Sequence, residues 1–433
     1  MTPSEPRKIE PARALVGHAV VPGDKSISHR AVLLAAVGEA ETEITGFGRS
    51  GDTESTLRAV RALGAEVEEP DVDIVRVRGR GLRGLASPGE PIDAGNAGTL
   101  MRLLAGLLAG QEGRFELSGD ESLSRRPMER VAAPLRALGA RVETTDGHAP
   151  IVVEGGALRG ITYELPVASA QIKSAVLLAG LYAKGRTTVV EPIATRDHTE
   201  LLLHHAGVDV QRKGLEVSVK GIERLELDRV DVPGDFSSAA ALIVAATLLP
   251  GSELYLHGVG INPTRTGLLD VLERMHARVT LFNKRKLGAE TVADIEVRSA
   301  SLVATRVAPA EVPRMVDELP LVALLAGLAR GETVIGGVQE LRVKETDRVE
   351  TVKDVLKPLG IRVSAGEDEL RVVGVPTRPK GGGSADSQGD HRIAMLGAVA
   401  GLVSREGLRL EGAEAAAVSF PGFFELLDSV SKR

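Results

Sequence analysis

One polar loop followed by an apolar helix recurs six times along the chain, and this repeat limits the possible folds more than any other feature. The six copies read GDKSISHRAVLLAAVG, GNAGTLMRLLAGLLAG, ASAQIKSAVLLAGLYAKG, GDFSSAAALIVAATLLPG, VDELPLVALLAGLARG and GDHRIAMLGAVAGLVSREG. A helix that is apolar on nearly every side belongs in a core. The repeat therefore predicts six related units, each with one buried helix.

A second series of helices follows the first. After a buried helix comes a short β-rich run, and then a helix that carries Arg, Glu and Lys between its apolar positions. Examples are TLRAVRALGAEV, PLRALGARV, LLLHHAGVDV, VLERMHARV and VLKPLGIRV. This pattern predicts helices with one solvated face. Each unit is expected to contain a loop, a buried helix, a strand, a surface helix and one or two further strands.

The length of the chain favours two domains, because its 433 residues exceed the size at which a single core stops growing. Three units per domain would place the boundary where the turn VPGD of VPGDKSISHR returns in VPGDFSSAAA. Pro-Gly favours a sharp turn, so the two copies are expected to mark crossings near 20–24 and 231–235. Two unrelated turns are the alternative.

The crossings define the predicted domains. Residues 23–232 form the first domain, and residues 1–22 together with 233–433 form the second. The two turns lead into different sequences, since KSISHR carries charges and hydroxyls whereas FSSAAA is small and neutral. We therefore assign the first copy to chemistry and the second copy to packing alone.

Composition excludes several classes of protein. The chain has no cysteine, which excludes disulfides and thiolate metal sites. Aromatic residues make up 2% and the net charge is -6, so nucleic acid is not expected as a partner. The amino terminus has no apolar signal region, and no apolar run approaches the roughly 20 residues that span a bilayer. We expect a soluble cytoplasmic protein with no membrane partner.

Polar residues are concentrated where the buried helices begin. They are Lys25, Ser26, Arg30, Asn96, Gly98, Thr99, Ser169, Gln171, Asp317, Glu318, Asp390, His391 and Arg392. The N–H groups of a helix start bind phosphate or carboxylate, although Ser, Thr, Asn and Asp are also ordinary N-caps. Capping does not explain Lys25, Arg30 and Arg392, because cations oppose the helix dipole there. These cations predict bound anions.

More cations precede helices of the second series. They are Arg125, Arg126, Arg196, Arg342, Lys344 and Arg348. In LRVKETDRV, Lys344 and Arg348 are expected to share one helix face at i, i+4, an unfavourable pairing that a bound anion would relieve. A solvated face with internal ion pairs is the alternative for Arg342 and Asp347.

No metal or cofactor is expected. His29, His198 and His391 lie near these loops, but no two have metal-ligand spacing. The chain contains no P-loop, nucleophile elbow or dinucleotide fingerprint. Substrate phosphate is therefore expected to contact Arg, Lys and helix starts directly.

The ordered motifs GDKSISHR, GNAGTLMR, RRPM, ASAQIKSA, LRVKETDR and GDHRIAM resemble those of the 5-enolpyruvylshikimate-3-phosphate (EPSP) synthase family. The resemblance implies an α/β (α+β) fold of two similar domains. Each would hold three β-α-β-α-β-β repeats with buried parallel helices, and the active site would lie in the interdomain cleft. It also implies transfer of the enolpyruvyl group of phosphoenolpyruvate to the 5-hydroxyl of shikimate 3-phosphate, with release of phosphate.

The resemblance further implies which residues bind the two anionic substrates. Shikimate 3-phosphate would be held by Lys25, Ser26, Arg30, Ser169, Ala170, Gln171, Arg196, Asp317 and Lys344. Phosphoenolpyruvate would contact Lys25, Gly98, Arg126, Gln171, Arg348 and Arg392. The absence of a side chain at Gly98 would let a ligand approach backbone N–H groups.

The implied reaction needs a base for the hydroxyl and an acid for the methylene carbon. We expect Asp317 to take the hydroxyl proton, and Glu345, assisted by Lys25, to protonate the methylene. Elimination would move the protons in the opposite sense. Glu318 is the adjacent competitor of Asp317, and an ordinary carboxylate at a helix start is its alternative role.

The chain departs from the family pattern at a few positions. Ala170 stands where many relatives have serine, Glu340 where some have asparagine, and Val418 and Ser419 where some have a phosphoenolpyruvate-binding lysine.

Two other classes of protein share a six-unit organisation and are the rival interpretations. A UDP-N-acetylglucosamine carboxyvinyltransferase commonly uses a cysteine acid, and a DNA clamp would spread its cations along helix faces. We expect a monomeric enzyme rather than either rival.

Overall fold

The computed structural model describes residues 5–433, and the chain divides into two compact units. Unit 1 contains the N-terminal segment up to Pro22, Gly234–Arg285 and Thr291–Arg433, and unit 2 contains Gly23–Pro233 and Lys286–Glu290. The chain thus passes between the units inside both VPGD turns. Lys286–Glu290 belongs to unit 2 although the sequence predicts that 233–433 lie together in the other domain. A hinge at the turns stays a prediction.

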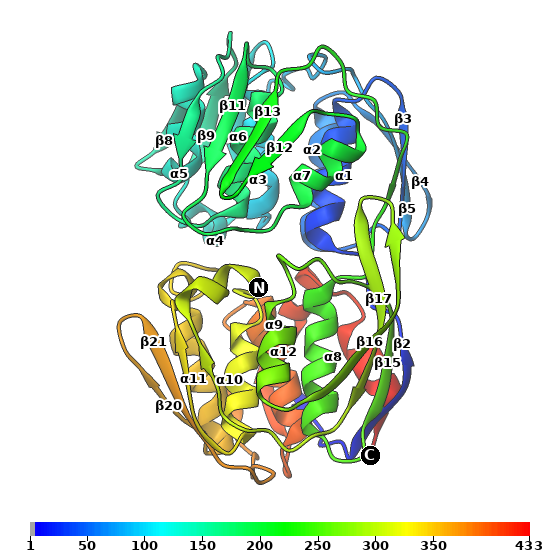
Figure 1. The fold of residues 1–433 in the computed structure, drawn as a ribbon, viewed down its shortest axis with the longest axis vertical. Helices are drawn as coiled ribbons and strands as arrows, with labels where there is room; N and C mark the ends of the chain where they lie inside the picture. Colours follow the sequence, from blue (N-terminus) through cyan, green and yellow to red (C-terminus); the bar gives the residue numbers. More distant parts are fainter. Residues whose placement is uncertain (1–4) are drawn as a thin grey trace. The chain divides into compact units, whose positions relative to one another are not determined.

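Three buried helices form the centre of unit 2 (Figure 1). They are α1 (Lys25–Ala36), α3 (Gly98–Leu108) and α6 (Ala170–Gly180). Helix α3 packs against both α1 and α6. The other helices of the unit are α2 (Gly51–Ala62), α4 (Glu121–Ser124), α5 (Glu129–Leu138) and α7 (His198–His205).

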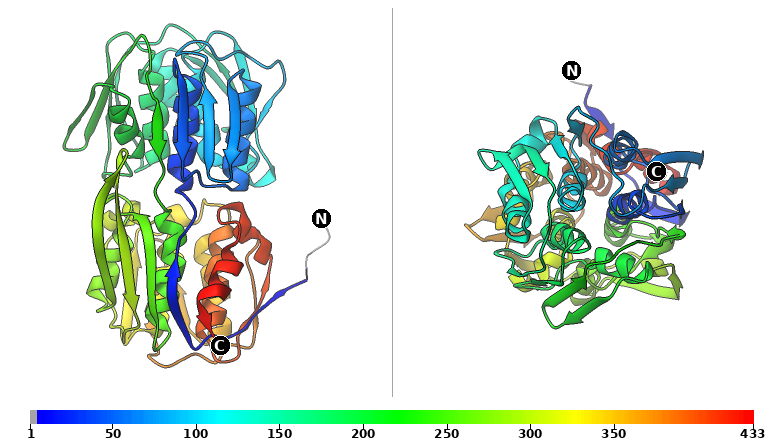
Figure 2. Two further views of the ribbon diagram at one scale, coloured as in Figure 1. Left: turned by 90° about the vertical axis from the view of Figure 1, so that its right-hand side faces the viewer. Right: turned by 90° about the horizontal axis from the view of Figure 1, so that it is seen from above.

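The sheets of unit 2 have the orders β14-β3-β5-β4, β6-β7-β9-β8 and β10-β11-β13-β12. In each sheet the first pair is parallel and the other pairs are antiparallel. The left panel of Figure 2 shows β14, from the end of the unit, beside β3 from its beginning. The strands are β3 (Glu41–Thr45), β4 (Glu66–Asp71), β5 (Ile74–Arg78), β6 (Ile92–Asp93), β7 (Arg114–Ser118), β8 (Arg141–Thr145), β9 (His148–Glu154), β10 (Thr162–Glu164), β11 (Arg186–Val190), β12 (Val210–Lys213), β13 (Glu216–Lys220) and β14 (Arg229–Asp231).

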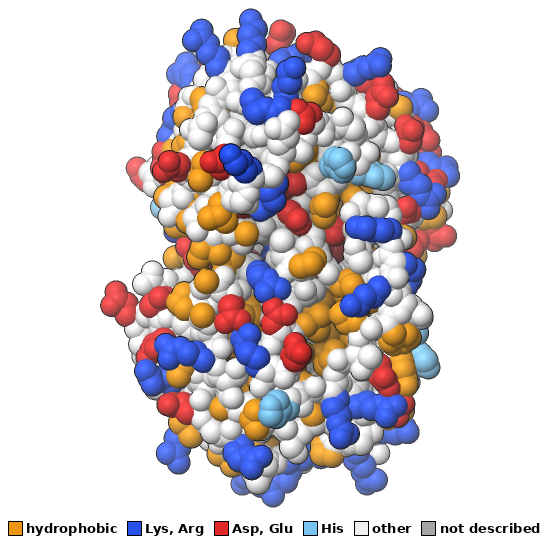
Figure 3. Space-filling model, in the orientation of Figure 1, with side chains coloured by type: hydrophobic (Ala, Val, Ile, Leu, Met, Phe, Trp, Pro, Cys, Tyr) orange, Lys and Arg blue, Asp and Glu red, His pale blue; other side chains and the backbone are white. Residues whose placement is uncertain are grey.

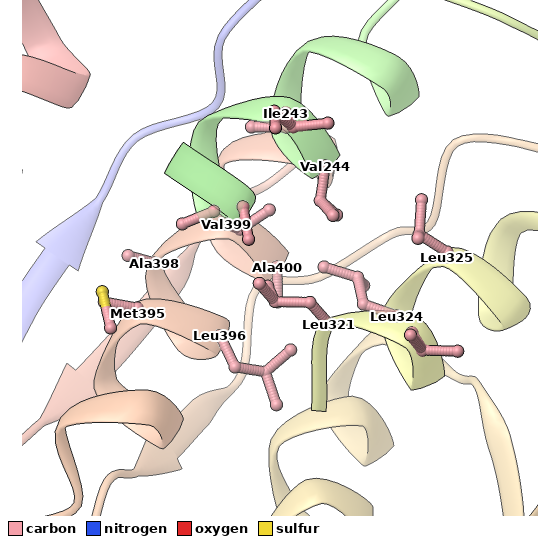
Figure 4. Close-up of a cluster of buried hydrophobic side chains, with 14 of the residues drawn as sticks. Ile243, Val244, Leu321, Leu324, Leu325, Met395, Leu396, Ala398, Val399 and Ala400 are labelled. Atoms are coloured by element: carbon pink, nitrogen blue, oxygen red, sulfur yellow. The ribbon is translucent and has the colours of Figure 1, made fainter. Parts of the chain in front are cut away.

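Unit 1 is built in the same way around α8 (Phe236–Leu248), α10 (Leu319–Leu328) and α12 (His391–Val403). Each of these helices packs against the other two. Figure 4 shows their side chains interlocking, with labels on Ile243, Val244, Leu321, Leu324, Leu325, Met395, Leu396, Ala398, Val399 and Ala400. Burying one Leu or Val stabilises the fold by about 1.5–3 kcal/mol. This burial explains why helices that are apolar all round recur in the sequence.

The sheets of unit 1 have the orders β16-β17-β15-β2-β24, β18-β19-β21-β20 and β1-β23-β22. Their strands are β1 (Arg7–Ile9), β2 (Ala14–Ala19), β15 (Glu253–Gly260), β16 (Arg278–Leu287), β17 (Glu290–Arg298), β18 (Arg306–Val307), β19 (Gly331–Gly336), β20 (Arg362–Ala365), β21 (Glu369–Gly374), β22 (Ser384–Asp386), β23 (Leu408–Glu411) and β24 (Ser431–Lys432). Helices α9 (Gly267–Arg274), α11 (Arg348–Leu356) and α13 (Phe423–Val430), with the 3-10 helices η1 (Pro309–Arg314), η2 (Gln339–Leu341), η3 (Lys357–Leu359) and η4 (Ala413–Val418), complete the unit.

The predicted fold class is confirmed. Both units combine buried helices with mixed sheets, and each has its own buried apolar cluster. Among the described helices, none is both long and apolar enough to cross a membrane. On the face drawn in Figure 3, positive and negative side chains are interspersed.

Candidate active site

Lys25 opens helix α1 in unit 2. The carboxylate of Asp24 caps this helix by accepting a hydrogen bond from the Ile27 N–H at 2.9 Å. The Lys25 ammonium lies 2.8 Å from Oδ2 of Asp52, near the start of α2. Both side chains are mostly buried, with 15% and 11% exposed. The lysine is therefore fixed at a helix start, where it opposes the helix dipole.

Arg30 lies one turn further along α1 and is buried. Its guanidinium donates to the Ser26 carbonyl at 2.8 Å, to the Thr199 hydroxyl at 2.7 Å and to the Ser174 hydroxyl at 3.1 Å. The pKa of Arg30 is lowered to about 10, mainly because the guanidinium is buried. Glu200 and Asp24 oppose this effect, and the positive charge of Arg196 adds to it. Arg30 is therefore a buried cation in the second turn of α1, where the helix dipole opposes it and a bound anion would offset it.

Gln171 connects α6 to the start of α3. Its Oε1 accepts a hydrogen bond from Arg102 at 2.7 Å, and its Nε2 donates to the Thr99 hydroxyl at 2.9 Å. These opposite partners fix the orientation of the amide. Gly98 is the first residue of α3, whose N-cap residue Ala97 makes no side-chain capping bond. The start of this helix is suited to a ligand oxygen.

Arg126 is oriented by a short polar chain. It donates to Oδ1 of Asn96 at 2.6 Å, and Asn96 in turn donates to Oδ2 of Asp120 at 2.8 Å. A Cβ atom added at Gly98 would lie 3.2 Å from the Arg126 guanidinium. Arg126 is therefore beside the start of α3, as the predicted phosphoenolpyruvate contacts require.

The other predicted residues of unit 2 also lie at or just before helix starts, those of α1, α6 and α7. Ser26 follows Lys25 on α1, while Ser169 is the N-cap of α6 and accepts from the Ile172 N–H. Ala170 is the first residue of α6. Arg196 lies just before α7 and close enough to Arg30 to affect its pKa.

In unit 1, Arg348 joins the predicted catalytic carboxylates. This buried arginine contacts Glu345 at 2.6 Å and Asp317 at 3.4 Å. It also donates two hydrogen bonds to Asp390, at 2.8 and 3.2 Å. Burial disfavours its charge, but Asp390, Glu345 and Asp317 outweigh burial and raise the pKa of Arg348.

The expected helical pairing of Lys344 with Arg348 is wrong. Helix α11 begins at Arg348, and Lys344 lies in the preceding segment. The helix begins there because Asp347 caps it, accepting from the Val349 and Glu350 N–H groups. Burial lowers the pKa of Lys344, and Asp317 partly opposes this effect. The alternative for Arg342 and Asp347 is confirmed, since they form an ion pair at 3.0 Å.

Arg392 lies in the first turn of α12, and its backbone N–H donates to Asp390. Its Nε is buried and has no hydrogen-bond partner among residues 5–433. The hydroxyl of Ser419 is likewise buried without a partner in the described part of the chain. Val418, beside it, ends η4, which packs on α12. Arg392 is thus a buried cation with unused donor capacity.

Within residues 5–433, no cluster of three or more His, Asp or Glu side chains could hold a metal ion. The histidines near the helix starts have other partners. His29 contacts the Thr56 hydroxyl at 2.6 Å, and His198 contacts Glu290 at 2.7 Å.

Sequence reasoning missed the partners that hold the predicted residues in place. They include Asp52, Arg102, Ser174, Thr199, Ser237 and Arg265. Arg265 could have been found, because it is another cation just before a helix start. Asp52 carried no such signal, since an acidic residue in a first turn is ordinary.

The six related units, each with a buried helix that follows a polar loop, define an α/β protein of two similar units, and comparison with known proteins specifies its family. A sequence model described as EPSP synthase (3-phosphoshikimate 1-carboxyvinyltransferase) matches residues 9–427. The 3-phosphoshikimate 1-carboxyvinyltransferase of Alkalilimnicola ehrlichii is 50% identical over 96% of this chain and 94% of its own length. The Salinibacter ruber protein of the same name is 49% identical over 98% of this chain and 99% of its own length.

Two solved structures share the fold, and the first of them is also similar in sequence. EPSP synthase from Acinetobacter baumannii superposes with a TM-score of 0.87 at 42% identity, over 98% of this chain and 97% of that one. The enolpyruvyl transferase NikO from Streptomyces tendae shares the fold, with a TM-score of 0.78 at 21% identity, over 99% of this chain and 98% of that one. The chain belongs to the EPSP synthase family, a family of transferases in the shikimate pathway.

Proposed function

We propose that the cations at the helix starts hold the two substrates of the family reaction. That reaction transfers the enolpyruvyl group of phosphoenolpyruvate to the 5-hydroxyl of shikimate 3-phosphate and releases inorganic phosphate. Both substrates carry phosphate and carboxylate groups, which arginine binds with paired hydrogen bonds. The observation that carries the proposal is that buried cations lie near the starts of buried helices, with Arg30 in the second turn of α1 and Arg392 in the first turn of α12.

The proposal divides the ligands between two sets of residues. Shikimate 3-phosphate is held by Lys25, Ser26, Arg30, Ser169, Ala170, Gln171, Arg196, Asp317 and Lys344. Phosphoenolpyruvate is held by Lys25, Gly98, Arg126, Gln171, Arg348 and Arg392. Support comes from the buried Nε of Arg392, which lacks a partner among the described residues, and from the uncapped start of α3 at Gly98.

In the addition step, Asp317 removes the proton of the 5-hydroxyl, and the oxygen bonds to the central carbon of phosphoenolpyruvate. Glu345, assisted by Lys25, protonates the methylene carbon. In the elimination step a methyl proton returns to Glu345 and phosphate leaves with the proton from Asp317. Contact of Arg348 with Asp317 supports the role of this carboxylate as the base, because a nearby cation favours the ionised form that accepts a proton. We propose that the enzyme acts as a cytoplasmic monomer, since one chain supplies every residue named.

The test is phosphate release from shikimate 3-phosphate and phosphoenolpyruvate in the presence of a metal chelator. Release should require both substrates. A folded protein that releases no phosphate would contradict the proposal.

Two variants then test which residues bind which substrate. Arg126→Gln should raise the KM for phosphoenolpyruvate more than that for shikimate 3-phosphate, and Arg196→Gln should do the reverse. Equal effects of both variants on both KM values would refute the division.

A further inference from the structure

The second VPGD turn leads into a buried polar contact rather than into packing alone. Asp235 caps α8 by accepting hydrogen bonds from the Ser237 N–H at 2.6 Å and the Ser238 N–H at 3.4 Å. Both serines are buried. The Ser237 hydroxyl donates to Oε1 of Glu318, which is fully buried at the start of α10. The neutral helix start therefore supplies a hydroxyl to the residue next to Asp317.

Arg265 occupies the centre of this contact. It lies just before α9 and only 3% of its side chain is exposed. Its Nη2 donates to the Ser237 hydroxyl and lies 3.7 Å from Asp235. Its Nη1 lies 3.5 Å from Glu318 and 3.4 Å from Oδ2 of Asp317. One buried guanidinium thus connects the helix start of α8 to the carboxylate proposed as the base.

Asp317 is held by a cation at each of its oxygens. Oδ2 faces Arg265, and Oδ1 faces Arg348 at 3.4 Å. The charge of Lys344 also acts on Asp317. The carboxylates nearby are Glu318, which shares Arg265, and Glu345, which shares Arg348. Arg348 contacts three carboxylates and is proposed to bind phosphoenolpyruvate. Arg265 is in neither of the two proposed sets of substrate-binding residues.

We propose that Arg265 is a positioning residue for the reaction, oriented by Ser237 and Glu318, and that it keeps Asp317 ionised and aimed. The inference rests on the proposed role of Asp317 as the base. A carboxylate accepts a proton only in its ionised form, and a nearby cation favours that form. The hydrogen bond of Arg265 to Ser237 fixes the guanidinium, because a buried arginine with several partners has little freedom to move away from Asp317.

The experiment compares Arg265→Gln, Arg265→Lys and Ser237→Ala in the full chain, with Arg298→Gln as the matched control. Arg298 is half-exposed on β17 and pairs with Glu253 and Glu296. For each variant, kcat, both KM values and the dependence of kcat on pH are measured. Arg265→Gln should lower kcat about 100-fold and leave both KM values within roughly threefold. The acid limb of the pH profile should move upward by about one unit.

The Arg265→Lys variant tests whether the positive charge at this position is enough, or whether the shape of the guanidinium is also needed. Arg265→Lys keeps the positive charge, so its acid limb should lie closer to that of the unaltered protein than the limb of Arg265→Gln does. If Arg265→Gln does not fold, as judged by circular dichroism, Ser237→Ala replaces it, with a smaller loss of kcat and a smaller upward shift. Unchanged kcat and an unmoved acid limb in the folded variants would overturn the inference.

A double variant distinguishes failure of this inference from failure of the proposed base. If Asp317→Asn alone retains turnover, Asp317 is not the base and the proposed function is wrong at that residue. If Asp317→Asn loses turnover, Arg265→Gln added to it should cause no further loss, because residues that act through one group are not additive. A further 100-fold loss in the double variant would show that Arg265 acts independently of Asp317 and would overturn the inference.

Discussion

The guanidinium of Arg348 and the carboxylate of Asp390 form a paired hydrogen bond, with Nε to Oδ2 at 2.8 Å and Nη2 to Oδ1 at 3.2 Å. Asp390 also caps α12 by accepting from the Arg392 N–H. One carboxylate therefore connects the first residue of α11 to the first turn of α12. Both side chains are almost completely buried, so this pair sets the position of two predicted phosphoenolpyruvate ligands.

Removal of one member of this pair should be strongly destabilising. Arg348→Gln leaves Asp390 buried without its cation, which should lower the free energy of unfolding by about 3–5 kcal/mol. Addition of Asp390→Asn should recover part of this loss, because asparagine still caps a helix and carries no charge. Urea denaturation of both variants measures the effect, with Arg371→Gln on the exposed face of β21 as the control. A double variant less stable than Arg348→Gln would contradict the prediction.

Gly98 should tolerate no side chain without a change in substrate binding. A Cβ atom there would lie 2.8 Å from Arg102 and 3.2 Å from Arg126. Arg102 is held by Gln171 and Arg126 by Asn96, so displacement of either breaks a hydrogen bond worth about 1 kcal/mol. Gly98→Ala should therefore raise the KM for phosphoenolpyruvate roughly tenfold.

The control for this variant is Gly51→Ala at the start of α2, where an added Cβ meets no atom within 4 Å. Alanine favours a helix over glycine, so Gly51→Ala should be no less stable than the unaltered protein, whereas in Gly98→Ala the broken hydrogen bond offsets this gain. Steady-state kinetics and urea denaturation check both statements. Equal KM values for phosphoenolpyruvate in Gly98→Ala and Gly51→Ala would show that Arg102 and Arg126 can move without weakening substrate binding, and would contradict the prediction.

The buried helices and the cations at their starts could be predicted from the sequence because both are local patterns. An all-round apolar helix and an arginine at a helix start need no knowledge of distant residues. The pairing of Lys344 with Arg348 on one helix was a wrong prediction because two local patterns competed. The charge spacing suggested a helix through both residues, but Asp347 is the N-cap of α11 and lies between them. The repeat predicted the six related units, and the resemblance to the family implied the fold class.

Partners that are distant in the sequence could not be predicted in this way. Lys173 lies in an apolar stretch of α6, yet it is fully buried against Glu191 at 3.1 Å and Glu200 at 2.7 Å. Its partners come from a different segment of unit 2, and nothing in the local sequence indicates which carboxylates will be close. The contact of Arg265 with Asp317 is of the same kind, because 52 residues separate the two.

A buried histidine should make the stability of unit 2 depend on pH. Burial lowers the pKa of His29 from 6.5 to about 3, and Asp52 only partly opposes this effect. Between these values the unfolded chain binds a proton that the folded chain does not, so the free energy of unfolding falls as the pH falls through 6.5. At pH 5 the loss due to His29 should be about 2 kcal/mol relative to pH 7.

His29→Gln removes the titrating group. Between pH 7 and pH 5 the free energy of unfolding of this variant should therefore fall by about 2 kcal/mol less than that of the unaltered protein. His204→Gln, on an exposed position of α7, is the matched control and should follow the unaltered protein. Urea denaturation at both pH values gives the two differences. The sign is decisive, because a histidine that gained a proton partner on folding would instead stabilise the protein at low pH. Parallel losses in His29→Gln and His204→Gln would show that His29 takes up its proton in the folded state as readily as in the unfolded chain.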